Sequence, residues 1–216
     1  MLILALRTRF NKTYREILPL SVTIAILPVV FRISYKWIYL KMKVILDLKQ
    51  IKRILENLVD IIISDTPDNQ DIAIIGIRSR GEVLAQRLSN LLSNKLDSNI
   101  PCGTLDITLY RDDLNSPNST AQPLVRTTEI GFDIDNKVII LVDDVLYTGR
   151  SVRAAIDALI DLGRPKAIRL AVLVERQGRE FPIQADYAGY KCDANPGESV
   201  QVNLVESDGK DEVVVE

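Results

Sequence analysis

The segment from Val138 to Ser151 constrains the fold most, because it reads as a buried strand that runs through a short loop into a helix. Its first five residues, Val138 to Val142, are all apolar, which is typical of a strand buried on both faces of a parallel sheet. Two carboxylates, Asp143 and Asp144, follow at once. Small and polar residues come next, and apolar residues then recur at helical spacing between Val152 and Ile160. The segment therefore predicts an α/β fold.

The loop and the acid pair together indicate a binding site for a phosphorylated sugar. A loop that enters a helix offers free backbone N–H groups and the positive end of the helix dipole to a phosphate. Carboxylates at the carboxyl end of a parallel strand suit sugar hydroxyls and a hard cation such as Mg²⁺. The alternative is a strand that merely ends in a solvated acidic turn. No Gly-Lys-Ser/Thr follows Gly149 and no G-x-G-x-x-G is present, which excludes a P-loop nucleotide site and a dinucleotide-binding fingerprint.

A second strand, loop and helix precede the first set. Ile72 to Gly76 is apolar, Arg78 and Arg80 follow, and a helix with an apolar face begins near Gly81. Guanidinium groups and the amides at a helix start suit a pyrophosphate. The alternative is that both arginines are simply solvated. In a parallel sheet the two loops open on the same edge, so the pair predicts one site.

The remaining chain continues the alternation of helices and strands. Asp47 is a good N-cap for a first helix. The apolar residues of that helix share one face: Leu48, Ile51, Leu55, Leu58 and Ile62. Leu105 to Tyr110 predicts a half-buried strand, Ala167 to Val174 a buried strand and Val200 to Leu204 an edge strand. The polar stretch from Arg111 to Thr128 is typical of a lid or a disordered segment. We expect an open, mainly parallel sheet with helices on both faces.

Composition narrows the chemistry. The chain has 216 residues and contains no histidine, which excludes catalytic triads and metal sites that depend on an imidazole. Its two cysteines, Cys102 and Cys192, are far apart and show no zinc-site spacing, so we expect a cytoplasmic protein. The formal net charge of −2 gives no overall basic character for nucleic acid, although a local basic face remains compatible with it.

Residues 1–41 differ from the rest of the chain. Basic residues flank an apolar run from Ile17 to Phe31 that is shorter than the roughly 20 residues of a membrane-spanning helix. Pro19 and Pro28 interrupt the run. We expect an extension outside the main domain, with translation starting at Met42, and no stable membrane partner; a membrane anchor is the alternative.

The motifs resemble those of type I phosphoribosyltransferases, and in particular their pyrimidine regulatory subgroup. The apolar strand, the acid pair and V-x-x-T-G resemble the family's motif for phosphoribosyl pyrophosphate (PRPP). Three further strings resemble the subgroup: GIRSRG from Gly76, DITLYRDDL from Asp106 and GRPKAIRLAVLVERQGREFPIQADYAG from Gly163. The resemblance implies a type I phosphoribosyltransferase-like sheet with a small hood, and makes residues 42–216 the phosphoribosyltransferase domain.

The resemblance also implies the reaction and the residues of the site. Uracil and PRPP would give UMP and pyrophosphate, with Mg²⁺ bound through PRPP and not by direct side-chain ligation. Asp143 and Asp144 would hold the ribose hydroxyls, while Arg80 and Arg111 would bind the pyrophosphate as the other catalytic residues. The residues implied for PRPP are Ser79, Arg80, Val145, Leu146, Tyr147, Thr148, Gly149, Arg150 and Ser151. Those implied for the base are Arg176, Ala185, Asp186 and Val200.

Members of the subgroup also bind the leader RNA of the pyrimidine operon in response to UMP, and the resemblance implies a homodimer or higher homo-oligomer. On the exposed side of the first helix Lys52 and Arg53 suit RNA, whereas Glu56 and Asp60 would repel phosphate. Residues 177–179 lack the histidine usual in the subgroup. A uracil phosphoribosyltransferase without RNA regulation, or an enzyme for another base, is therefore the alternative.

Overall fold

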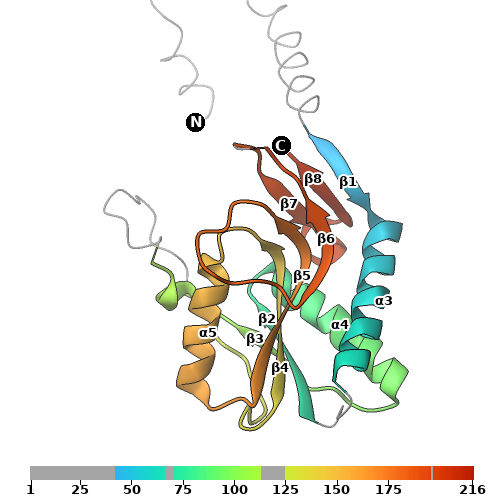
Figure 1. The fold of residues 1–216 in the computed structure, drawn as a ribbon. Coiled ribbons are helices and arrows are strands. Elements are labelled where there is room, and N and C mark those ends of the chain that lie inside the picture. The colour runs from blue at the N-terminus through green and yellow to red at the C-terminus, as the bar shows by residue number, and fades with distance from the viewer. Residues whose placement is uncertain (1–41, 67–70, 113–124, 196) are drawn as a thin grey trace, which may run out of the picture. The chain divides into compact units, whose positions relative to one another are not determined.

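A five-stranded parallel sheet forms the centre of the protein, in the order β3-β2-β4-β5-β6 (Figure 1). The computed structural model describes residues 42–66, 71–112, 125–195 and 197–216. The strands are β2 (Ile72–Ile77), β3 (Cys102–Leu105), β4 (Val138–Leu146), β5 (Ala167–Arg176) and β6 (Tyr187–Cys192). All six residues of β2 are buried, as expected for a strand covered on both faces.

Helices cover both faces of this sheet, as predicted. The helices α3 (Leu48–Asp65) and α4 (Arg80–Leu96) pack on one face, and α5 (Arg150–Leu162) packs on the other (Figure 1). The residues of β4 alternate between the two layers, because successive side chains of a strand point to opposite faces. Ile140 and Val142 join the core with α3 and α4, whereas Ile139 and Leu141 join the core with α5.

The ends of the helices follow local side-chain chemistry. Asp47 caps α3, as predicted: it accepts a hydrogen bond from the Gln50 N–H at 2.9 Å, and the Gln50 side chain accepts one from the Asp47 N–H. Two predicted core residues are wrong. Leu48 is 55% exposed because it opens the helix, and Ile160 is 61% exposed near the end of α5. Helical spacing alone did not reveal that these two positions face solvent.

The predicted strand from Leu105 to Tyr110 is wrong. The strand β3 ends at Leu105, and the short 3-10 helix η3 (Thr108–Tyr110) follows it. The Asp106 carboxylate causes this change of direction, because it accepts hydrogen bonds from the N–H of Thr108 at 3.1 Å and from its hydroxyl at 2.6 Å. The same carboxylate accepts a bond from the N–H of Arg126 and so closes the polar segment between them.

A second, smaller sheet forms the predicted hood, with strand order β1-β8-β7 (Figure 1). It combines β1 (Lys43–Asp47) with β7 (Val200–Asn203) and β8 (Glu212–Val215), which pair antiparallel. The predicted edge strand ends at Asn203, one residue early, because Leu204 starts the short helix α6 (Val205–Asp208). The chain between β7 and β8 is therefore an acidic turn that projects from the hood.

Two predictions fall outside the described residues. These are the apolar run within residues 1–41 and the part of the lid from 113 to 124. In the ranges that are described, every helix is too short or too polar to cross a membrane.

Candidate active site

The acid pair lies near the end of β4, the central strand. The strand continues to Leu146 and does not end at Val142 as predicted, so Asp143 is held by pairing with Val172 of β5, and Asp144 follows it within the same strand. The side chains accept backbone hydrogen bonds of 2.9 Å, Asp143 from the Asp144 N–H and Asp144 from the Val145 N–H. Burial raises the pKa of Asp143, and the charge of Asp144 raises it further. Burial also raises the pKa of Asp144.

The segment from Val145 to Ser151, here called the phosphate loop, turns β4 into α5. Val145 and Leu146 are still strand residues, and Leu146 is buried in the core. Gly149 has φ +92°, a conformation that favours glycine, and stands at the N-cap of α5. The N-cap Gly149 has no side chain, and the Thr148 hydroxyl accepts a hydrogen bond from the Arg150 N–H at 3.3 Å. The next amides of the first turn, those of Ser151 and Val152, are the ones that can bind an anion.

The second loop comes into direct contact with the acid-bearing strand. A Cβ atom on Gly81 would lie 2.5 Å from the Val142 carbonyl oxygen and 3.1 Å from the Asp143 Cα atom, so only glycine permits this approach. Gly76 and Val142 are also partners in the β2–β4 register. The start of α4 therefore packs against β4 beside the acids, and the two predicted loops meet at one edge of the sheet.

Three arginines surround this edge. The charge of Arg80 lowers the pKa of Asp144, and the charge of Arg111, directly after η3, lowers the pKa of Asp143; both effects oppose the rise caused by burial. Arg78 instead forms ion pairs with two glutamates, with Glu129 at 2.9 Å and with Glu82 at 3.4 Å. Ser79 is the N-cap of α4 and makes no capping hydrogen bond with its side chain.

The hood-side segment after β5 closes over the phosphate loop. Backbone N–H groups of Glu180 and Phe181 both donate to the Thr148 carbonyl at 3.0 Å. The Arg176 guanidinium stacks 4.1 Å from the centroid of the Tyr147 ring and donates to the Glu198 carbonyl at 2.7 Å. Arg176 is 7% exposed, and its Nε has no hydrogen-bond partner among the described residues. This buried donor could bind a polar ligand on that side.

The structure does not bring the other residues predicted for the base to the acid pair. Asp186 accepts a hydrogen bond from the Leu170 N–H at 2.8 Å, in the first half of β5, and lines a groove of about 400 Å³ beside α5. Ala185 packs against the α5 core. Val200 is partly buried in β7, opposite Val215. The acids and the loops therefore form one group that these three residues do not join.

Sequence analysis missed several acidic partners of the site. Arg150 donates to Asp112 at 2.7 Å and to Glu180 at 2.6 Å, and stacks over the ring of Phe181 at 5.2 Å. Asp208 binds Arg80 from 128 residues away along the chain. No local sequence pattern predicts such pairs, because each pair joins elements that only the fold brings together.

Residues 42–207 match the family model of the phosphoribosyl transferase domain. The chain belongs to this phosphoribosyltransferase family. The match covers β1 to α6, and so includes the acid pair, both loops and most of the hood.

Relatives and solved structures agree with this assignment. The bifunctional protein PyrR of Pelotomaculum thermopropionicum is 47% identical over 171 residues, 79% of this phosphoribosyltransferase and 93% of that protein. PyrR of Deinococcus radiodurans is 50% identical over 167 residues, with 77% and 90% covered. The hypoxanthine phosphoribosyltransferase of Trypanosoma cruzi shares the fold, with a TM-score of 0.61 at 16% identity over 80% of this chain and 95% of that one. The resemblance to the pyrimidine regulatory subgroup is confirmed.

Proposed function

We propose that this phosphoribosyltransferase joins uracil to the ribose of PRPP and releases pyrophosphate, giving UMP. The observation that supports this most directly is the contact of Gly81 with β4, which sets a cationic loop and an anion-binding loop on either side of one acid pair. PRPP has the matching groups, with a 5′-phosphate and a pyrophosphate on either side of a ribose. The relatives named PyrR and the subgroup motifs favour uracil as the base.

In the reaction, the bond from ribose C1′ to the pyrophosphate oxygen breaks and a bond from C1′ to uracil N1 forms, while the N1 proton is released to water. Asp143 and Asp144 accept hydrogen bonds from the ribose hydroxyls and place negative charge beside the cationic sugar of the transition state. The open amides of α5 hold the 5′-phosphate. Arg80 and Arg111 stabilise the charge that develops on pyrophosphate.

Mg²⁺ fits this donor set. Burial raises the pKa of both acids, and a cation on PRPP would favour their ionised form. Within the described ranges, no group of three or more metal-binding side chains is present, and we propose that the ion binds through PRPP oxygens. Bound there, Mg²⁺ would neutralise charge on the leaving group.

The base would lie on the hood side, near Arg176. Its unpartnered Nε is one donor for a base carbonyl, and the Tyr147 ring holds the guanidinium in place. Ala185, Asp186 and Val200 remain predicted base contacts. Contact with a base at the acid pair would require the segments that carry these three residues to move toward the acids.

The decisive experiment compares Asp144→Asn with the wild type in a PRPP-dependent assay against uracil, orotate, hypoxanthine and adenine. Asp144→Asn should lower UMP formation by about 10²–10³-fold, because the amide cannot supply the negative charge. Asp157→Asn is the matched control, since Asp157 pairs with Arg153 on α5, and it should retain wild-type turnover. Near-normal turnover by Asp144→Asn, or a wild type that prefers another base, would contradict the proposal.

A second function, UMP-dependent binding of pyrimidine leader RNA, is favoured by the name of the bifunctional relatives and by one observation on α3. Lys49, Lys52 and Arg53 are exposed along this helix. Asp60, which the sequence suggested would repel RNA, pairs with Lys95 of α4 at 2.5 Å. Its charge is therefore compensated, and the electrostatic objection weakens.

The remaining proposals concern assembly and location. A homodimer or higher homo-oligomer remains a prediction from the resemblance. The cytoplasm is the proposed location, since the chain has only two cysteines, Cys102 and Cys192, which lie far apart in the sequence.

A further inference from the structure

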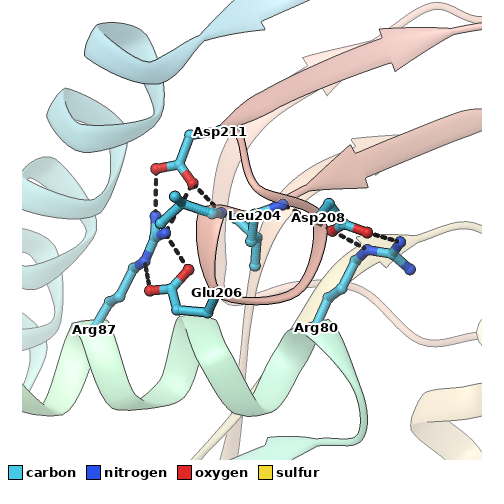
Figure 2. A network of polar contacts seen from close by, with 7 residues as sticks. Arg80, Arg87, Leu204, Glu206, Asp208 and Asp211 are labelled. Atoms are coloured by element: carbon cyan, nitrogen blue, oxygen red, sulfur yellow. Dashed lines mark hydrogen bonds and ion pairs between the residues drawn. The ribbon is translucent and has the colours of Figure 1, made fainter.

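The turn between β7 and β8 contacts the start of α4 through two arginines. Arg80, the first residue of α4, pairs with Asp208, and Arg87, two turns further along, pairs with Glu206 and Asp211 (Figure 2). These contacts join the hood to the loop that is proposed to bind pyrophosphate. Neither the transferase function nor RNA binding explains why Arg80 should be bound to a carboxylate.

The geometry of the Arg80 pair leaves part of the guanidinium available. Nε donates to one oxygen of Asp208 at 3.3 Å and Nη2 donates to the other at 3.0 Å. Figure 2 shows the third nitrogen, Nη1, pointing away from the carboxylate. Nη1 donates to no group among the described residues. A guanidinium has five N–H donors, so a bidentate carboxylate on one edge leaves the Nη1–Nη2 edge for a second anion.

Arg80 lies beside the acid pair, since the next residue, Gly81, packs against the backbone of β4 at Val142 and Asp143. Arg80 is close enough to Asp144 for its charge to lower the pKa of that buried acid. The Arg80 side chain is 35% exposed, so without a partner it would sample many rotamers. A carboxylate that binds one edge restricts the rotamers of Arg80, and so fixes the direction in which the other edge is presented.

Asp208 is itself held firmly. It accepts a hydrogen bond from the Leu204 N–H at 3.0 Å, and this bond and the Arg80 charge keep the pKa of its carboxyl below its ordinary value. Arg87 anchors the rest of the turn, donating to Asp211 at 2.7 and 2.8 Å. Burial is partial here, so the rigidity comes from the network of paired charges and not from one salt bridge.

We infer that Asp208 is a positioning residue, which orients Arg80 so that its Nη1–Nη2 edge binds the pyrophosphate of PRPP. This inference rests on the proposed phosphoribosyl transfer and adds a residue from the hood to it. Competition between Asp208 and pyrophosphate for the same nitrogens is the opposite hypothesis. The free edge argues against competition, since both anions can bind at once.

The test uses Asp208→Asn and titrates the protein with inorganic pyrophosphate and Mg²⁺ by calorimetry, alongside PRPP kinetics. Loss of orientation should raise the Kd for pyrophosphate and the KM for PRPP by about threefold to tenfold, with kcat within about twofold. The effect should vanish when Arg80→Lys is already present, because an ammonium has no second edge to orient.

Asp211→Asn is the matched control. Asp211 accepts from two nitrogens of an arginine and from a backbone N–H of the same turn, Val205 at 2.8 Å, but its arginine is Arg87. This control should lower Tm and leave the Kd for pyrophosphate within about twofold. Equal weakening by both variants, or tighter binding by Asp208→Asn, would overturn the role of Asp208. A wild type that binds no pyrophosphate would instead overturn the proposed function and this role with it.

Discussion

At the scale of single residues, the acid pair shows the conflict between stability and function. Asp143 is 8% exposed and its neighbour Asp144 carries the same charge, so burial and this neighbour both oppose the ionisation of Asp143 in the free protein. Arg80 and Arg111 compensate part of this cost from a distance. The residues that suit a bound ribose and Mg²⁺ therefore destabilise the ligand-free folded protein.

We expect Asp143→Asn to stabilise the free protein while abolishing turnover. The pKa of Asp143 is raised in the folded state, so its ionisation favours unfolding as the pH rises above its ordinary value of about 4. The gain should therefore be absent at acidic pH and grow as the pH rises toward neutral. Urea unfolding between pH 4 and 8 measures it.

Asp133→Asn is the control for that series. Asp133 also accepts a backbone hydrogen bond, from the Asp135 N–H at 2.9 Å, but is exposed. It should show no pH-dependent gain. If both variants behave alike, or if Asp143→Asn loses stability at neutral pH, burial of the charge is not the dominant cost.

At the scale of elements, the phosphate loop depends on the segment after β5. Gly178 has φ +116°, and a Cβ atom there would lie 2.2 Å from Cε2 of Tyr147. Arg179 donates to the Tyr147 carbonyl at 2.8 Å, and Arg176 stacks on the ring. The phosphate loop and the hood-side segment therefore move as one unit, which links the binding of PRPP to that of the base.

Gly178→Ala should separate this unit. The added methyl pushes Tyr147 away from Arg176, so we expect a loss of about 1–3 kcal/mol in stability and weaker PRPP binding. Gly197→Ala is the matched control, because Gly197 also has a positive φ, +92°, but has nothing within 4 Å of the added Cβ. Thermal unfolding and PRPP titration of both variants measure the difference. Equal losses would show that backbone conformation, and not Tyr147, decides the effect.

At the scale of the whole molecule, the sheet edge with the acid pair and the α3 surface with Lys49, Lys52 and Arg53 are separate surfaces that the core connects. The helix α3 packs against α4, and its C-terminal residue Asp65 accepts a hydrogen bond from the Tyr187 hydroxyl of β6 at 2.7 Å. The helix α4 begins at the pyrophosphate loop. This gives a physical connection through which a nucleotide at the site would influence the α3 surface.

UMP should increase the affinity for pyrimidine leader RNA, and Lys52→Glu or Arg53→Glu should each reduce that affinity by roughly threefold to tenfold, as expected for a lost phosphate contact. Filter binding across a range of salt concentrations, with and without UMP, measures both effects. Lys166→Glu is the control, since Lys166 is exposed but distant in sequence from α3. Unchanged binding with UMP, or equal losses in all three variants, would contradict RNA recognition by α3.

The sequence predicted the parts of this protein that local pattern controls. The apolar run into Asp143 and Asp144 gave the central strand and the acids, since a strand buried on both faces requires an unbroken apolar sequence. Asp47, a good N-cap residue, gave the start of α3. The alternation of apolar and polar residues wrongly predicted a strand at Asp106, because the Asp106 side chain competes with the sheet for backbone hydrogen bonds.

By itself, the sequence determined the α/β fold, the two loops at one edge and the family, because each is written in residues that are neighbours along the chain. Only the tertiary structure decided which charges meet: Arg78 with Glu129, Asp60 with Lys95, and Arg80 with Asp208. Such pairs depend on side chains from separate elements that arrive within 2.5 to 3.0 Å of each other, where charge-assisted hydrogen bonds form. The fold fixes these distances, and no spacing along the sequence encodes them.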